Sequence, residues 1–225
     1  MPKSYDLRRI GFAAFWLSLG VLLLAAQGWA DGVSFNSPTG DLGSATQTYT
    51  LDGINIVATG FNGGDLFGKN IGAGEQGVGL AGDPSGDHEI FATTNPAQDY
   101  IQLNLLSLIT AGFTNFEFQM GSTTGTEQWQ VTACATPGVT GSGPCAANAF
   151  TITGSNDFIT LVPGNLSAAD PFLDFSSNSG NVLLGMIAAT APATVPETAT
   201  SGLLLAGMLA LVAVVLWKRR MAEQA

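Results

Sequence analysis

The stretch with the densest ionisable chemistry is Gly82–Ile90, whose glycines and proline are typical of a turn. It carries three carboxylates, those of Asp83, Asp87 and Glu89, and Asp99 follows soon after. Carboxylate oxygens on a flexible loop suit Ca²⁺, so the pattern favours a calcium site on Asp83, Asp87 and Glu89. The spacing is not that of an EF-hand, and the competing interpretation is a solvated turn whose aspartates accept bonds from nearby backbone amides. No other cofactor is predicted.

The two cysteines of the chain, Cys134 and Cys145, flank a loop rich in glycine and proline. In an exported chain the oxidising compartment favours a disulfide that closes this loop, stabilising the fold by about 2–3 kcal/mol in the chain-entropy model. The alternative is a redox or metal-binding pair. That alternative lacks both the Cys-x-x-Cys spacing and an accompanying histidine.

Few residues offer catalytic chemistry. A Ser-His-Asp triad would need His88, the sole histidine, and no Gly-x-Ser-x-Gly motif accompanies it, since Ser142 lies between the cysteines. Glycoside hydrolysis needs only two carboxylates, and Glu117 and Glu127 lie on strands that we expect to be adjacent. Outward-facing glutamates on strands are nevertheless typical of a solvated face, and we predict no enzymatic activity.

The elements that must position these groups are strands. Between Asp31 and about Ala193 the sequence alternates apolar and polar residues, which is the period of half-buried strands. Two hairpins are expected, one turning at Leu51–Gly53 and one at Gly121–Thr126. The alternating or apolar runs are Thr46–Thr50, Ile54–Thr59, Ile101–Leu105, Phe116–Met120, Gln128–Ala133, Phe150–Thr153, Phe158–Val162, Phe172–Phe175 and Val182–Ile187.

Many short strands at regular spacing predict an all-β fold, an antiparallel β-sandwich or jelly-roll-like ectodomain over residues 31–189. The aromatic side chains expected to point into its core are those of Phe116, Phe118, Trp129, Phe150 and Phe158. No internal repeat is evident.

The amino terminus has the organisation of an export signal. A basic start precedes the apolar run Ile10–Ala26, and the small residues Gly28 and Ala30 fit the specificity of signal peptidase. We therefore predict that residues 1–30 are a signal peptide that passes through the Sec translocon and is cut after Ala30. The alternatives are an uncleaved membrane anchor and, given Arg8 and Arg9, twin-arginine export.

The carboxyl terminus predicts a second membrane segment. Residues 190–198 form a linker, and a helix over residues 199–217 would be about 28 Å long, close to the hydrocarbon thickness of a bilayer. The basic tail of residues 218–225 should remain cytoplasmic by the positive-inside rule, which leaves residues 31–198 outside the inner membrane.

Three features of this tail carry a family resemblance: Val195-Pro196-Glu197, then Leu203–Leu216, then Lys218, Arg219 and Arg220. This order resembles the PEP-CTERM sorting signal of exported proteins of Gram-negative bacteria, with Thr198 where the family usually has a second proline. The resemblance covers about the last thirty residues. It implies cleavage near the Pro-Glu motif by exosortase, and delivery to a cell surface or matrix associated with exopolysaccharide and biofilm.

Charge and composition restrict the function further. Residues 31–195 hold fourteen acidic residues and one lysine, a net charge of −13, which excludes a nucleic-acid phosphate backbone as partner. Two function classes remain. The first is a structural protein of the cell surface or matrix, associated with polysaccharide or cations. The second is a lectin-like, carbohydrate-binding sandwich, with calcium as its cofactor in one version.

Overall fold

The computed structural model describes residues 30–72, 75–93, 97–123, 126–147, 149–155, 159–164, 166–192 and 207–208. One compact unit spans Trp29–Pro192. Its described part consists of antiparallel strands and one short helix, α2 (Leu106–Thr110), which confirms the all-β prediction. None of the described helices is long and apolar enough to cross a bilayer. Apart from residues 207–208, the predicted signal peptide before Ala30 and the predicted membrane helix lie outside the described residues.

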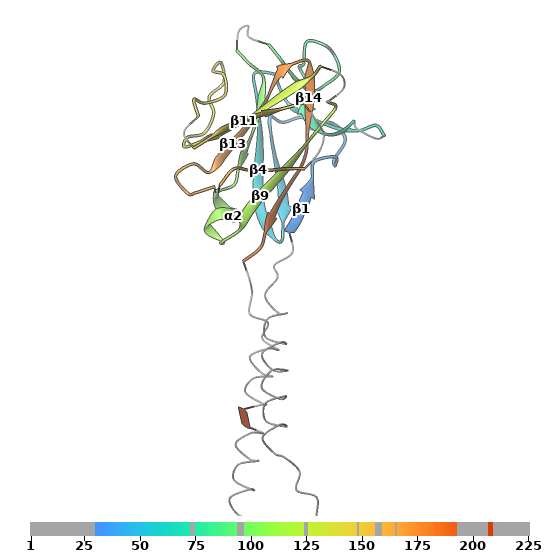
Figure 1. The fold of residues 1–225 in the computed structure, drawn as a ribbon. Helices are drawn as coiled ribbons and strands as arrows, with labels where there is room; N and C mark the ends of the chain where they lie inside the picture. Colours follow the sequence, from blue (N-terminus) through green and yellow to red (C-terminus); the bar gives the residue numbers. More distant parts are fainter. Residues whose placement is uncertain are drawn as a thin grey trace, which may run out of the picture. The chain divides into compact units, whose positions relative to one another are not determined.

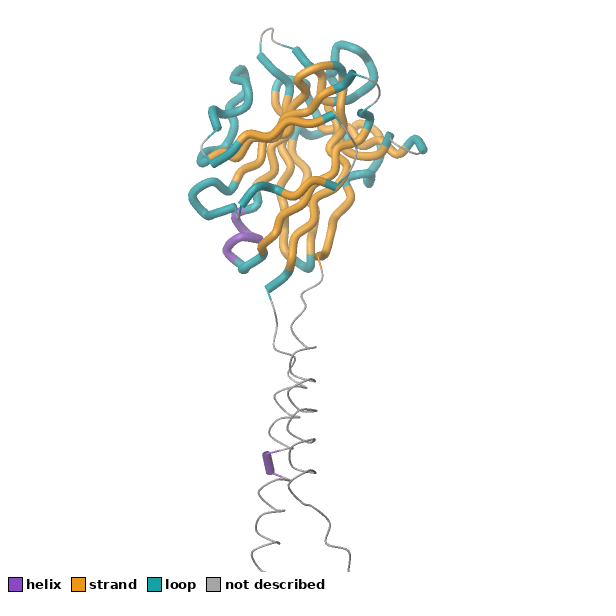
Figure 2. The backbone as a smooth tube through the Cα atoms, in the orientation of Figure 1, coloured by secondary structure: helices purple, strands orange, loops and turns teal. Residues whose placement is uncertain are grey.

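The strands form two sheets, which face each other in a sandwich-like arrangement (Figures 1 and 2). The larger sheet, sheet A, has the order β12-β9-β14-β6-β5-β2, and β1 and β7 also pair with β14. Its strands are β12 (Thr160–Leu161), β9 (Thr114–Gly121), β14 (Asn181–Thr190), β6 (Gln76–Leu80), β5 (Leu66–Asn70), β2 (Gly40–Asp41), β1 (Ala30–Ser34) and β7 (Ile90–Phe91).

Sheet B has six strands in the order β11-β10-β13-β8-β4-β3. They are β11 (Thr151–Gly154), β10 (Gln128–Cys134), β13 (Phe172–Ser179), β8 (Tyr100–Asn104), β4 (Ile54–Phe61) and β3 (Thr46–Leu51).

The core lies between the sheets and joins them through aromatic contacts. Phe118 of sheet A meets Trp129 of sheet B at a ring-centroid distance of 5.2 Å and Phe175 at 5.5 Å, both edge to face. Such contacts add about 0.5–1.5 kcal/mol each to the burial of the rings. Phe116, Phe118 and Trp129 are buried as predicted and Phe150 is partly buried, whereas Phe158 lies outside the described residues.

The first predicted hairpin is confirmed. β3 and β4 pair along their whole length from Thr46↔Thr59 to Leu51↔Ile54. The two residues between them, Asp52 and Gly53, both have positive φ, at 49° and 77°. Two consecutive positive φ angles characterise the turn that matches the twist of paired strands, which explains the Asp-Gly sequence.

The second predicted hairpin is wrong. β9 pairs with β12 and β14 in sheet A, whereas β10 pairs with β11 and β13 in sheet B. The chain therefore crosses from one sheet to the other after Gly121. Alternation reports only that one face of each strand is buried, and both arrangements bury the same faces. The glycosidase hypothesis required Glu117 and Glu127 to lie on adjacent strands. The structure shows that they do not.

The glycines of β5 and β6 belong to strands that carry no alternation in the sequence. A Cβ on Gly79 would lie within 2.2 Å of the His88 backbone oxygen, and one on Gly77 within 2.4 Å of the Leu184 oxygen. The backbone at His88 and at Leu184 can pack this closely against β6 only because Gly79 and Gly77 lack side chains. The close packing at Gly79 lets the acidic turn after β6 fold back against β6 itself.

The two ends of the sandwich differ in what they carry. Ala30 at the start of β1 pairs with Thr190 at the end of β14. The first strand of the domain therefore begins, and the last strand ends, side by side at the same end of the sandwich (Figure 1). Asn181, nine residues earlier in β14, pairs with Phe91 at the opposite end. This opposite end, here called the distal end, carries the acidic turn.

Candidate functional site

The acidic turn at the distal end is organised around Asp83. Its Oδ1 accepts a hydrogen bond from the Ser85 amide at 2.8 Å, and its Oδ2 accepts bonds from the Ser85 hydroxyl at 2.5 Å and the Glu89 amide at 3.2 Å. Asp83 is buried despite its charge. An Asp that binds amides two and six residues ahead fixes the turn, as the turn interpretation of this segment expects.

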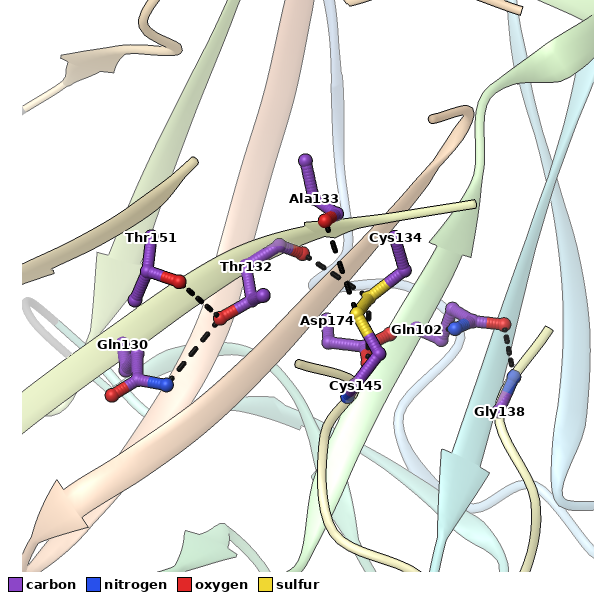
Figure 3. The surroundings of a disulfide bond; sticks show 9 residues. All are labelled: Gln102, Gln130, Thr132, Ala133, Cys134, Gly138, Cys145, Thr151 and Asp174. Carbon is purple, nitrogen blue, oxygen red and sulfur yellow. Dashed lines mark hydrogen bonds between the residues drawn. A yellow bond between two sulfur atoms is a disulfide. The ribbon is translucent and has the colours of Figure 1, made fainter. Parts of the chain in front are cut away.

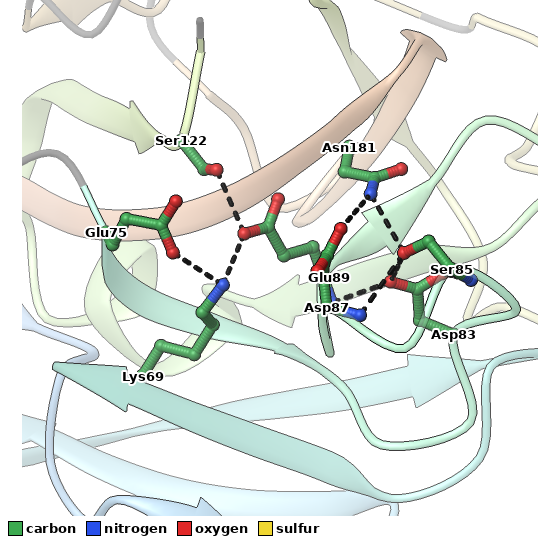
Figure 4. Close-up of polar contacts among 8 residues, drawn as sticks. All are labelled: Lys69, Glu75, Asp83, Ser85, Asp87, Glu89, Ser122 and Asn181. Atoms are coloured by element: carbon green, nitrogen blue, oxygen red, sulfur yellow. Dashed lines mark hydrogen bonds and ion pairs between the residues drawn. The ribbon is translucent and has the colours of Figure 1, made fainter. Parts of the chain in front are cut away.

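Glu89 belongs to a buried ionic cluster (Figure 4). Its Oε1 lies 2.5 Å from the Lys69 Nζ and accepts a bond from the Ser122 hydroxyl at 2.9 Å. The Lys69 Nζ also contacts Glu75 at 2.7 Å. Lys69 and Glu89 are only 6% and 2% exposed, so this pair lies in the interior of the fold.

The pKa values in this cluster follow burial and pairing. Burial alone would lower the pKa of Lys69, but the bonds and charges of Glu75 and Glu89 outweigh it and raise that pKa. Burial raises the pKa of Glu89, and Lys69 and Ser122 offset part of that rise. Lys69 therefore remains an ammonium and is unsuited to act as a nucleophile at neutral pH.

Asp87 and His88 make separate contacts. The Asn181 side-chain amide donates to Asp87 Oδ2 at 3.2 Å and to the Ser85 hydroxyl at 2.9 Å. The His88 ring stacks on Phe67 with centroids 4.1 Å apart, and its Nδ1 lies 3.1 Å from a backbone oxygen. These contacts tie the turn to β14 and β5.

The three carboxylates predicted to share a calcium ion thus have three different sets of partners. Among the described residues, the one group of three acidic, cysteine or histidine ligand atoms within 4.8 Å of one another is Cys134, Cys145 and Asp174. Asp83, Asp87 and Glu89 do not form such a group, and calcium binding remains a prediction.

Asp99, which directly precedes β8, is the least satisfied acid of the distal end. It is 3% exposed, and its buried Oδ2 has no hydrogen-bond partner. Burial, together with the nearby charge of Asp83, raises its pKa to about 6. No sequence pattern predicts this environment, and only the short separation from the acidic turn along the chain points to Asp99.

The second polar cluster surrounds the predicted disulfide on the outer face of sheet B (Figure 3). Cys134 and Cys145 are bonded, with their Cα atoms 6.0 Å apart. Asp174 of β13 lies beneath the bond, where its Oδ2 accepts from the Cys145 amide at 3.0 Å and lies 3.1 Å from Cys134 Sγ. Because the sulfurs are joined to each other, neither is a thiolate ligand, and the metal-binding alternative loses its donors.

The same cluster covers the centre of sheet B. Gln102 donates to Asp174 Oδ1 at 2.6 Å and accepts from the Gly138 amide of the disulfide loop at 3.0 Å. Alternation in β8 predicts Gln102 on a solvated face, but the loop buries it to 4% exposure. Burial raises the pKa of Asp174, and the bonds from Cys145 and Gln102 oppose that rise.

Most of the predicted sorting residues lie outside the part of the chain that the structure describes. Ala30 opens β1, and its backbone pairs with Thr190. Val195, Pro196, Glu197, Lys218, Arg219 and Arg220 lie outside the described residues. The sorting assignment therefore rests on the sequence.

No protein-family model matches this chain, and no curated protein or solved structure is significantly similar to it.

Proposed function

We propose that this chain is the precursor of an exported structural protein of the cell surface or extracellular matrix, sorted through its PEP-CTERM-like tail. The observation that carries the proposal is the antiparallel pairing of β1 with β14, which from Asp31↔Ala189 to Ser34↔Met186 does not depend on Ala30. A domain with membrane segments before its first strand and after its last must release both chain ends towards one membrane. Adjacent ends at one end of the sandwich meet that requirement.

The short linker supports the same interpretation. Pro196 is the sixth residue after Thr190, and this stretch spans at most about 20 Å when fully extended. A membrane protease that cuts near Pro196 would thus cut close to the end of the last strand of the folded domain. The Cys134–Cys145 disulfide suits the oxidising side of that membrane.

Two features support a structural role over an enzymatic one. Lys69, the one lysine of residues 31–195, is held in an ion pair. Glu117 lies on β9 of sheet A, whereas Glu127 directly precedes β10 of sheet B. The acidic surface that remains suits association with cations and hydrated polysaccharide.

The sorting proposal is tested by replacing Pro196 and Glu197 together with alanine in the native bacterium. We expect the variant to accumulate as unprocessed chain in the inner membrane, whereas the wild type reaches the surface with a lower intact mass. The exchange Ala193→Ser with Thr194→Ser, in the linker before the motif, serves as a control and should be processed like the wild type. Release of the double-alanine variant at wild-type mass would contradict the sorting assignment.

The alternative, a lectin-like module, predicts exposed aromatic rings on which a sugar can stack. Tyr49 and Tyr100, the candidates for such rings, are buried at 6% and 0% exposure. A glycan array probed with the purified protein, with and without Ca²⁺, separates the two classes. Specific micromolar binding would replace the purely structural proposal.

A further inference from the structure

The two cysteines of the disulfide differ in their access to solvent. Cys134 ends β10 and is buried at 0% exposure, whereas Cys145 belongs to the loop that follows and is partly exposed. A thiol cleaves a disulfide by direct attack of its thiolate on one of the two sulfurs. A thiol from the medium therefore reaches this bond through Cys145, and Cys134 is the sulfur that must leave.

The surroundings of Cys134 oppose its departure as a thiolate. Its Sγ lies 3.1 Å from Asp174 Oδ2 and 3.7 Å from the Thr132 backbone oxygen, so both of its polar neighbours among the described residues are oxygens (Figure 3). A thiolate is stabilised by N–H donors and positive charges, and a negative charge beside it favours the protonated thiol. Residues 31–195 contain no arginine, and their one lysine, Lys69, is paired with two glutamates.

Asp174 is held firmly in this position. It is 1% exposed, and its carboxylate accepts bonds from the Gln102 side chain at 2.6 Å and from the Cys145 amide at 3.0 Å. One of its oxygens and the sulfurs of Cys134 and Cys145 all lie within 4.8 Å of one another. A fixed carboxylate at this distance repels an incoming anion as well as a developing thiolate, and burial weakens the screening of that repulsion by salt.

We propose that Asp174 protects the disulfide from thiols, so that exchange is confined to Cys145 and is slowest with negatively charged thiols. In the step that Asp174 opposes, a thiolate forms a bond to Cys145 Sγ and the bond between the two sulfurs breaks. The electron pair of that bond goes to Cys134 Sγ, which takes up the proton that the attacking thiol released to the solvent. The products are a mixed disulfide on Cys145 and a free thiol at Cys134.

This inference assigns Asp174 a role beyond its bonds to the loop. As a positioning residue it acts on the reactivity of a neighbouring bond through its charge, and the reagent class that it discriminates is the small thiol. The inference concerns the folded domain alone, so its failure would leave the sorting proposal unaffected.

The test compares Asp174→Asn and Asp52→Asn with the wild type, as full-length chains purified in detergent at pH 8. Asp52 is exposed in the β3–β4 turn at φ 49°, a conformation that asparagine also adopts readily, so Asp52→Asn controls for the change in net charge. Each protein is treated with cysteamine, a cationic thiol, or with 3-mercaptopropionate, an anionic thiol. Early samples are stopped with acid, and peptide mass spectrometry locates the mixed disulfide on one of the two cysteines.

We expect the mixed disulfide of the wild type on Cys145. Asp174→Asn should react at least tenfold faster with 3-mercaptopropionate, and this acceleration should exceed that with cysteamine at least threefold. Asp52→Asn should react like the wild type. Gln102→Leu removes two bonds of the cluster but keeps the charge, so it should accelerate both thiols by the same factor. The ratio of the two thiols therefore separates the charge of Asp174 from a loosening of the loop.

Two results would overturn the proposal. The first is a mixed disulfide on Cys134 in the wild type, a measurement that needs no variant and so holds even if Asp174→Asn does not fold. The second is a ratio of cysteamine to 3-mercaptopropionate rates that is the same in Asp174→Asn as in the wild type.

Discussion

Asp174 and Asp99 are both buried aspartates, yet they lie in contrasting surroundings. Asp174 accepts bonds from the Cys145 amide and the Gln102 side chain beneath the disulfide loop. Asp99 lies at the distal end with an oxygen that has no partner. Burial alone therefore does not tell whether a carboxylate is structural. The donors around it separate an acid that holds the fold together from one whose burial the protein does not offset.

Glu89 is the strongest example of an acid that holds the fold together, and its replacement should have the largest effect on stability. Glu89→Ala leaves Lys69 buried with only the half-exposed Glu75, which should lower the free energy of unfolding by about 3–5 kcal/mol. Denaturant unfolding measures this loss. Glu75→Gln is the matched control and should cost less than about 1 kcal/mol, because Glu75 is 43% exposed. Equal losses in the two variants would show that burial of the pair is unimportant.

The disulfide cluster should show an intermediate effect. Replacing Cys134 and Cys145 together with serine frees a loop with a sequence separation of 11, which should cost about 2–3 kcal/mol. Reduction of the wild type with dithiothreitol should produce a similar loss in the same unfolding assay. An unchanged midpoint would mean that the Gln102–Gly138 bond and Asp174 suffice to hold the loop.

Tyr49 is a neutral counterpart of Asp99, because it also has a buried oxygen without a hydrogen-bond partner. Its hydroxyl is buried without a hydrogen bond, and its ring meets Phe35 edge to face at 4.6 Å. Tyr49→Phe keeps that packing and removes the orphan oxygen, so it should stabilise the protein by up to about 1 kcal/mol.

Unfolding at alkaline pH tests the burial of the Tyr49 hydroxyl by a second route. Burial raises the pKa of Tyr49 from 10.0 to about 12, so the folded state favours the protonated phenol. Stability tied to Tyr49 is complete below pH 10 and is lost as the pH rises towards 12. The Tyr49→Phe variant should lose less stability than the wild type over that interval. Parallel pH curves would contradict this assignment.

The sequence was informative where a pattern is local. Alternation located β3, β4, β9 and β10, and the Asp52-Gly53 pair located a turn, because side-chain period and positive φ are encoded within a few residues. The cysteines indicated their own bond through composition and compartment. Asp83 lies in the predicted turn and makes the backbone bonds typical of one.

Long-range pairing was not readable in the same way. Nothing in Gly121–Thr126 distinguishes a hairpin from a crossing between sheets, and β5 and β6 carry glycines where their neighbours need room. The partners of Lys69 and Asp174 are 20 and 72 residues away in the chain, at Glu89 and Gln102. Such contacts depend on the order of the strands, which no local window contains.

The position of β14 also has a consequence for biogenesis. This strand pairs with β1, β6, β7 and β9, although it is the last strand of the domain to be synthesised. A chain threaded through a membrane from its amino terminus would hold sheet A open, with the edges of those four strands unpaired, until Thr190 had crossed. Completion of the domain would then coincide with arrival of the C-terminal hydrophobic segment at the translocation channel, so that folding and membrane retention become neighbouring events in time.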